Sequence, residues 1–269
     1  MVVFPNAKIN IGLYITEKRP DGFHNLETAF FHVPWTDILE ITPSDTFSFT
    51  STGLAIAGNL TDNLCVKAYH LLKKQFELPA VDIHLHKIIP MGAGLGGGSA
   101  DATYTLLALR DLFNIPLTNQ ELIPFAQQLG SDCAFFLEDS PQFGTGKGDH
   151  LQAIETRLTG LWALLIFPNF GVSTQQAYSG VKPQKAPYYL PDALKSPIES
   201  WKNTISNDFE KTIFPLFPQL ETIKENLYEM GALYAAMSGS GSTMFGLFAA
   251  EPSEEFFQNK NFTTKVVKF

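Results

Sequence analysis

The sequence predicts a chain of mixed strands and helices in two domains, and three observations support this prediction. Segments with the periodicity of a strand and segments with the periodicity of a helix follow one another in mixed order. The chain has 269 residues, 45% hydrophobic and 17% charged, so it can bury a full core without metal ions or disulfides. Glycine-rich segments recur far apart in the sequence, which favours two domains of modest size over one large domain.

The first 50 residues are expected to form a sheet. Residues 8–15 and 38–49 alternate in part between apolar and polar side chains, which is the pattern of a half-buried strand. The segment 18–24 is rich in turn residues and connects them. The beginning of the chain is therefore predicted as strands joined by tight connections.

A helix and another strand follow. Apolar residues recur at helical spacing over residues 61–76, and Thr61 or Asp62 is available to cap the first turn. Residues 81–89 alternate in part and predict a strand, which leads directly into the glycine-rich segment 91–99.

The segment after the glycines is expected to be helical. Ser99 is a good N-cap for a helix whose apolar face includes Leu106 and Leu109. Residues 118–121 have the form of a capping box, and Gly130 is placed to end the helix that this box begins. The predicted order is strand, glycine loop, helix, helix.

The second half of the chain mixes strands, loops and helices. Residues 144–149 form a turn cluster, and residues 161–167 predict a buried strand. A boundary between them divides the chain into predicted domains at 1–155 and 156–269. The remaining segments are a proline-rich loop over 180–197, a helix over 217–230 that stops at Gly231, and two strands that flank residues 238–242.

Charge and cysteine content restrict the function. The formal net charge of −8 argues against a generally basic face for nucleic acid, so an anionic ligand must be held locally. Cys65 and Cys133 form no CxxC pair, which indicates a reducing compartment. The first 24 residues lack the pattern of a signal peptide, and the longest apolar runs are too short to span a bilayer. We expect a cytoplasmic protein with no nucleic-acid or membrane partner; the sequence does not define its oligomeric state.

Three interpretations compete for the glycine-rich segment. A P-loop is disfavoured because Gly98 stands where its lysine is required. Gly92, Gly94 and Gly97 match the dinucleotide fingerprint GxGxxG, but the helix is not followed by the second parallel strand of that fold. The third interpretation is a phosphate cradle at a helix N-terminus, with Ser99 facing the phosphates or a bound Mg²⁺. A merely flexible turn seldom needs five glycines within seven residues before a helix, so we favour the cradle.

Five segments together resemble one family of enzymes. The segment 90–101, PMGAGLGGGSAD, resembles the nucleotide loop of the GHMP kinases, the superfamily of galactokinase, homoserine kinase and mevalonate kinase. The other segments narrow the resemblance to the diphosphocytidyl-methylerythritol kinases, in whose order they occur. They are AKINI at 7–11, RPDGFH at 19–24, LGSDC at 129–133 and MSGSGS at 237–242.

The resemblance implies a fold, a reaction and cofactors. It implies the α+β, two-domain GHMP kinase fold with the active site in the cleft between the domains. The expected reaction is phosphorylation by ATP, with Mg²⁺, of a hydroxyl on a small molecule, the cytidine diphosphate conjugate of a methylated polyol, in isoprenoid precursor biosynthesis. The alternatives are another GHMP alcohol kinase of the homoserine or mevalonate type, a non-catalytic sensor with the same fold, and a NAD-binding oxidoreductase.

The resemblance also assigns roles to residues of this chain. It places Asp132 beside the accepting hydroxyl as a base and Lys8 near both that carboxylate and the phosphoryl group. The alternative from sequence alone is that Asp132 caps a helix and Lys8 is a solvated strand residue. The nucleotide would be bound by Asn63, Lys87, Pro90, Met91, Gly92, Ala93, Gly94, Leu95, Gly96, Gly97, Gly98 and Ser99, and Ser99 would also bind the metal ion.

The substrate contacts follow from the same resemblance. Asn10 is expected at the alcohol end, and Phe23, His24, Thr174 and Tyr178 at the cytidine end. Tyr178 is equally compatible with ordinary core packing. Phe23 stands where the family usually has tyrosine, and Ala93 replaces a common glycine, which is a mild change if its φ is negative.

Two further histidines have the spacing of metal ligands. His84 and His86 would share one face of a strand, but no third ligand is evident from the sequence.

Overall fold

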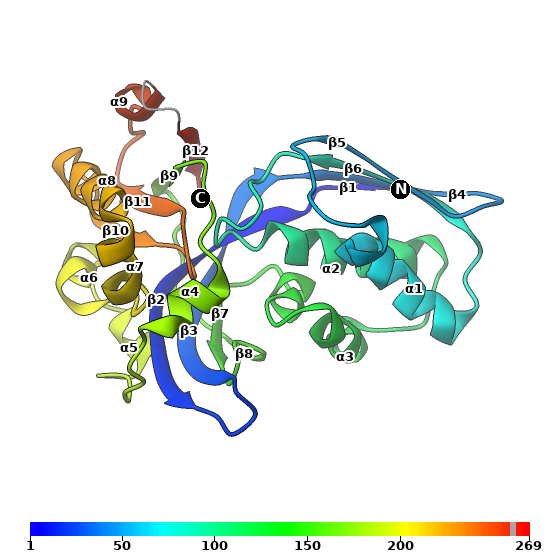
Figure 1. The fold of residues 1–269 in the computed structure, drawn as a ribbon, viewed down its shortest axis with the longest axis horizontal. Helices are drawn as coiled ribbons and strands as arrows, with labels where there is room; N and C mark the ends of the chain where they lie inside the picture. The colour runs from blue at the N-terminus through cyan, green and yellow to red at the C-terminus, as the bar shows by residue number, and fades with distance from the viewer. Residues whose placement is uncertain (259–261) are drawn as a thin grey trace. The chain divides into compact units, whose positions relative to one another are not determined.

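The computed structural model describes residues 1–258 and 262–269, and the chain forms two compact units. Unit 1 comprises residues 1–7, 35–91 and 96–139, and unit 2 comprises residues 8–34, 92–95 and 140–269. The chain thus enters each unit more than once (Figure 1). No helix in the described ranges is both long enough and apolar enough to cross a membrane. The division into domains at 155/156 stays a prediction.

Unit 1 is a four-stranded sheet covered on one face by helices (Figure 1). The strand order is β1-β4-β6-β5, with β5 parallel to β6 and the other pairs antiparallel. Alternate residues of β6 are buried, as the sequence pattern predicts. The elements are β1 (Val2–Val3), β4 (Ile38–Pro43), β5 (Ser48–Gly53), β6 (Val81–Lys87), α1 (Leu64–Phe76), α2 (Gly97–Leu112), α3 (Asn119–Leu129) and the short 3-10 helices η1 (Leu60–Asp62) and η2 (Cys133–Leu137).

Helix starts in unit 1 differ from two predictions. The cap of α1 is Asn63, whose side chain accepts a hydrogen bond from the Cys65 amide, rather than Thr61 or Asp62. These two residues belong to the 3-10 helix η1, which ends at Asp62, before the cap of α1. Helix α2 begins two residues before Ser99, because Gly96 at its N-cap adopts the left-handed conformation that glycine tolerates.

The capping-box prediction in unit 1 is confirmed. Thr118 and Glu121 cap α3 reciprocally, and the helix ends at Gly130.

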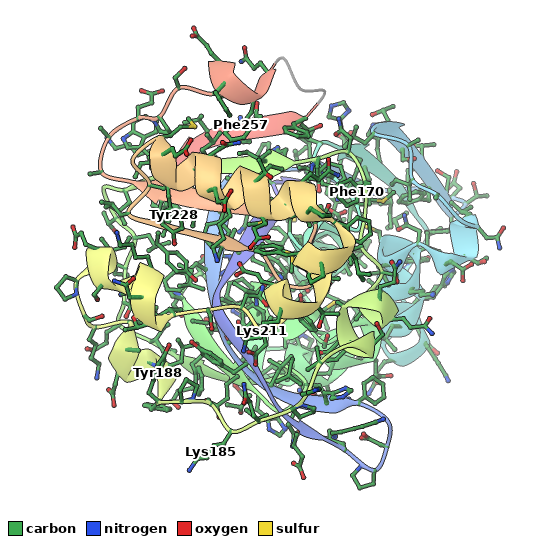
Figure 2. All side chains as sticks on the ribbon, turned by 60° about the vertical axis from the view of Figure 1, so that its left-hand side comes forward. Phe170, Lys185, Tyr188, Lys211, Tyr228 and Phe257 are labelled. Carbon is green, nitrogen blue, oxygen red and sulfur yellow. The ribbon has the colours of Figure 1, made fainter. Side chains whose placement is uncertain are left out.

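Unit 2 is built around two four-stranded sheets with the orders β2-β3-β7-β8 and β10-β11-β9-β12. Helix α8 contacts β10 and β11, and the hydroxyl of Tyr228 on α8 both donates to and accepts from the backbone of Ala235 (Figure 2). The elements are β2 (Asn6–Lys18), β3 (His24–Thr36), β7 (Gln142–Thr145), β8 (His150–Ala153), β9 (Trp162–Phe167), β10 (Tyr234–Met237), β11 (Met244–Phe248), β12 (Thr263–Lys268), α4 (Thr174–Ser179), α5 (Leu190–Ala193), α6 (Ile198–Thr204), α7 (Glu210–Leu216), α8 (Pro218–Glu229) and α9 (Glu255–Gln258).

The strands that flank residues 238–242 and the buried strand near 161–167 are confirmed as β10, β11 and β9. The prediction of an uninterrupted loop over 180–197 is wrong, because α5 lies within it. Leu190 is fully buried and Pro191 suits the first turn of a helix, so a short helix forms where proline content alone predicts a loop.

Candidate active site

The start of α2 in unit 1 has the geometry of an anion site. The Ala100 amide donates to the Gly96 carbonyl at 2.9 Å, so the amides of the three residues between them precede the hydrogen-bond ladder of the helix. These three residues are Gly97, Gly98 and Ser99, and α2 is 16 residues long. A helix of this length carries a partial positive charge at its N-terminus, which favours phosphate there.

A pocket of about 180 Å³ lies beside this helix start and belongs to unit 1. It brings the two predicted nucleotide residues outside the glycine loop, Asn63 and Lys87, together with Met91 and Gly98 of the loop. Its other lining residues are Ile56, Ala57, Asn59, Asp62, Leu64, Cys65, Leu85 and Asp101.

Lys87 is itself almost fully buried, because it lies on the same inward face of β6 as Ile83 and Leu85. Its ammonium donates to the carboxylates of Asp37 and, at 2.7 Å, Asp101. Burial works against the Lys87 charge, but the two carboxylates outweigh it and raise the pKa of Lys87 overall. Burial also raises the pKa of Asp101, since desolvation outweighs the attraction of Lys87 and the nearby Asp37 charge adds to the shift.

In unit 2 the predicted catalytic lysine lies at the meeting point of three motifs. Lys8 is 3% exposed, and its ammonium donates to Asn10 Oδ1 at 2.6 Å and to the Gly94 carbonyl at 2.9 Å. The Ser238 hydroxyl donates to the same Gly94 carbonyl at 2.8 Å. Lys8 is therefore not a solvated strand residue, and the first motif and both glycine motifs converge on one peptide group.

Gly94 fits there only because it has no side chain. Its φ is +77°, and a Cβ would lie 2.0 Å from the Ser238 carbonyl oxygen. Ala93 lies outside the positive-φ region, so its replacement of a glycine is tolerated, as expected.

Two residues that sequence reasoning missed support this meeting point. The buried amide of Asn207 donates to the carbonyls of Met237 and Gly239, each at 2.8 Å, and so holds the second glycine loop. Thr28 accepts from Asn10 Nδ2 at 3.0 Å and therefore orients the amide that Lys8 contacts. A polar residue in a strand or loop carries no local signal of such partners, which come from distant parts of the chain.

The predicted cytidine residues gather elsewhere in unit 2. The rings of His24 and Tyr178 stack with centroids 4.7 Å apart, and Tyr178 also packs edge-on against Phe209. Phe23 is 58% exposed, and the Lys147 ammonium lies 5.0 Å from its ring centroid. Burial lowers the pKa of His24, and the charge of Lys18 lowers it further. The imidazole is therefore neutral near pH 7 and offers one hydrogen-bond donor and one acceptor.

The predicted base lies in unit 1. Asp132 occupies the N-cap position of η2 but makes no side-chain capping bond to it, which weakens the purely structural interpretation. The Ser131 hydroxyl is 3.4 Å from Asp132 Oδ1. The next residue, Cys133, is buried, and burial raises the pKa of its thiol to about 11, so it is a packing residue.

The remaining predicted residues have simple placements. Thr174 opens α4 directly after its N-cap, Ser173. His84 and His86 share hydrogen bonds with Thr52 on the neighbouring strand. In the described part of the chain, no three histidine, cysteine, aspartate or glutamate side chains gather as a metal site would require.

Two family models match the chain in the regions that hold these features. The model described as GHMP kinases N terminal domain matches residues 63–139, and the model described as GHMP kinases C terminal matches residues 190–264. The class of protein that this fold and these motifs define is therefore the GHMP kinases.

Individual relatives define the family more narrowly. The chain is 50% identical over 255 residues to the 4-diphosphocytidyl-2-C-methyl-D-erythritol kinase of Bacteroides fragilis, with 93% of each chain covered. It is 48% identical to the enzyme of the same name from Cytophaga hutchinsonii, with 96% of each chain covered. A crystal structure of 4-(cytidine 5'-diphospho)-2C-methyl-D-erythritol kinase superposes with a TM-score of 0.80 at 31% identity, covering 92% of this chain and 90% of that one. The chain belongs to the 4-diphosphocytidyl-2-C-methyl-D-erythritol kinase family, which confirms the resemblance and the fold.

Proposed function

We propose that this protein transfers the γ-phosphoryl group of ATP to a hydroxyl of diphosphocytidyl-methylerythritol, a step in isoprenoid precursor biosynthesis. The observation that carries the proposal is the convergence of Lys8, the first glycine loop and the second glycine loop on the Gly94 peptide group. The identity of the chain to relatives that bear this enzyme's name supports the choice of alcohol.

The nucleotide would bind at the start of α2. The amides of Gly97, Gly98 and Ser99 suit the phosphates, because they precede the helical hydrogen-bond ladder. The adjoining pocket of about 180 Å³, lined by Asn63, Lys87 and Met91, would receive the adenine.

The donor set fits a Mg²⁺ ion that is held mainly by the substrate. Mg²⁺ keeps several waters and commonly binds phosphate oxygens with few protein ligands. The described residues contain no carboxylate cage, and Ser99 supplies a hydroxyl in the first turn of α2. Ser99 would hold the ion, which neutralises phosphate charge when bound.

Asp132 and Lys8 would carry the transfer. The hydroxyl oxygen of the substrate forms a bond to the γ-phosphorus, the bond from that phosphorus to the bridging oxygen of ADP breaks, and Asp132 accepts the hydroxyl proton. The transition state is loose, so a weak base suffices. The Lys8 ammonium would orient the alcohol through Asn10 and stabilise charge on the phosphoryl group.

The cytidine end would lie at the aromatic residues of unit 2. The exposed Phe23 ring is available to stack on the base, and the neutral His24 imidazole can pair with its polar edge. The Tyr178 ring stacks on the His24 imidazole and would hold its orientation. Thr174, in the same helix as Tyr178, would add a hydroxyl contact.

One assay tests substrate and reaction class together. Purified protein is incubated with ATP, Mg²⁺ and, separately, diphosphocytidyl-methylerythritol, homoserine and mevalonate, and ADP formation and the phosphorylated product are measured. We expect turnover of the cytidine conjugate alone. Turnover of homoserine or mevalonate instead would assign another branch of the GHMP kinases, and absence of ATP turnover with tight NADH binding would assign an oxidoreductase.

A further inference from the structure

A buried ionic cluster lies at the start of α2. Two of its three members, Lys87 and Asp101, line the pocket proposed for the adenine, but no step of the proposed phosphoryl transfer uses their charges. Asp37 comes from the turn between β3 and β4, Lys87 is the last residue of β6, and Asp101 lies in the second turn of α2. Their exposed fractions are 0%, 2% and 3%. All three belong to unit 1.

The cluster holds both ends of the first glycine loop. Asp37 Oδ1 accepts hydrogen bonds from the amides of Ile88 and Ile89, the residues that lead into the loop. The other oxygen of Asp37 binds the Lys87 ammonium, which also donates to Asp101 on α2. One chain of charge-assisted hydrogen bonds therefore links the residues just before the loop to helix α2 just after it.

The ammonium also lies close against the first residue of α2. A Cβ built on Gly97 would be 3.0 Å from Lys87 Nζ and 3.0 Å from Ile89 Cγ2. A movement of the Lys87 side chain would therefore change the contacts of Gly97, where the proposed phosphate-binding amides begin.

The charge of the cluster does not explain its presence. With all three groups ionised, one ammonium and two carboxylates sum to −1, which opposes phosphate binding at the adjacent amides. Asp101 Oδ1 is buried and has no hydrogen-bond partner among the described residues, so the cluster also carries a desolvation cost. What remains is geometry, because buried ionic groups can enforce one arrangement of the elements that carry them.

We propose that Asp37, Lys87 and Asp101 act as a strut, positioning residues that fix the first glycine loop in the conformation that binds nucleotide phosphates. The inference rests on the proposed function, since it takes the start of α2 as the nucleotide site. None of the three is a catalytic residue in this proposal.

The test uses Asp101→Asn and Lys87→Met in the full-length chain. Calorimetry measures the Kd of Mg²⁺-ADP, steady-state kinetics measure the KM of the alcohol, and hydrogen exchange of the nucleotide-free protein follows the amides of residues 88–100. We expect both variants to weaken ADP binding about tenfold or more, to leave the KM of the alcohol within about twofold, and to speed amide exchange in the loop.

The sign of the effect separates a strut from an electrostatic role. If the cluster acted only through its charge, Asp101→Asn would tighten ADP binding and Lys87→Met would weaken it. Opposite signs would overturn the proposal. Asp37→Asn is the third variant. Asp37 belongs to the cluster but does not line the pocket proposed for the adenine, so weaker ADP binding in this variant cannot come from a lost contact with the nucleotide. It also serves if Lys87→Met does not fold.

A matched control separates positioning from general destabilisation. Leu109 is fully buried about three turns further along α2, so Leu109→Ala loosens the same helix away from the loop. An equal loss of ADP binding in this control would overturn the strut. If the wild-type protein bound no nucleotide, the proposed function would fail, whereas unchanged loop exchange in Asp101→Asn would refute the strut itself.

Discussion

Phe23 and His24 are neighbours in sequence but have opposite environments. Phe23 lies in the turn before β3 with 58% of its surface exposed, whereas His24 begins the strand and stacks on Tyr178. The exposed Phe23 ring has a cation, Lys147, beside it and makes few packing contacts, so its face is accessible to a nucleobase. At the scale of single residues, selectivity for the cytidine end would depend on this pair in the proposed function.

Phe23→Ala should therefore raise the KM of the cytidine substrate and leave that of ATP almost unchanged. Loss of a stacked base costs about 1 to 3 kcal/mol, roughly a five- to hundredfold change. Phe23→Tyr is the control; it keeps the ring and should retain most of the wild-type affinity for the cytidine substrate. Steady-state kinetics of both variants decide, and equal impairment of ATP and alcohol would show that the ring belongs to the fold rather than to the site.

The lowered pKa of His24 predicts a pH dependence. Because burial depresses this pKa, the imidazole stays neutral through pH 7 and takes up a proton only below the ordinary histidine value of about 6.5. Protonation removes its acceptor, so the KM of the cytidine substrate should rise as the pH falls below that value. The measurement is a KM profile from about pH 5 to 8 for wild type and His24→Gln. The same acid limb in the variant would assign the titration to another group.

Asp132→Asn should lower kcat by roughly a hundredfold or more while leaving the Kd of ATP nearly intact, the scale expected for a positioned proton acceptor. The amide keeps the size of the carboxylate, so η2 should be unaffected. Single-turnover kinetics and ATP calorimetry provide the two readouts. Full activity of this variant would mean that Asp132 has only a structural role at the start of η2.

At the scale of elements, two positions of the first glycine loop differ in how much space they leave for a side chain. A Cβ on Gly97 would lie 3.0 Å from Lys87 Nζ and 3.0 Å from Ile89 Cγ2, which are side-chain atoms. Gly94 is the more restrictive position, since its Cβ would meet the Ser238 backbone. Backbone atoms cannot move aside as the end of a flexible side chain can.

Gly94→Ala and Gly92→Ala form a matched pair. Both glycines have positive φ, so alanine is strained at each by roughly 1 to 2 kcal/mol, but a Cβ on Gly92 would meet nothing within 4 Å. Gly94→Ala should therefore lower Tm and activity far more than Gly92→Ala. Thermal unfolding and ADP formation measure the difference. Equal effects would mean that backbone strain matters here and the contact with Ser238 does not.

At the scale of the whole molecule, nucleotide binding should appear as stability. Ligand at about a hundred times its Kd adds ~2.7 kcal/mol to the folded state. For a chain of this size, that raises Tm by roughly 5 to 10 °C. Differential scanning fluorimetry with ATP and Mg²⁺ should show this shift, and EDTA should reduce it. A comparable shift with NADH would contradict the kinase proposal.

Much of the fold was predictable because local signals agreed with it. The capping box at Thr118 and Glu121 and the strands around residues 238–242 need only neighbouring residues, and all are present. The cap of α1 and the short helix α5 were missed. In each case a local preference, Thr61 or a proline-rich stretch, was overruled by an adjacent turn or by burial of an apolar side chain.

The sequence by itself determined the family, the α+β fold and the identity of the motifs, because these depend on residue types in a fixed order. Only the tertiary structure showed that Lys8 and Ser238 share one carbonyl, that Asn207 holds the second loop, and that Lys87 forms ion pairs with Asp37 and Asp101. The physical reason is that hydrogen bonds and ion pairs join atoms close in space, whereas periodicity and capping report only on neighbours along the chain.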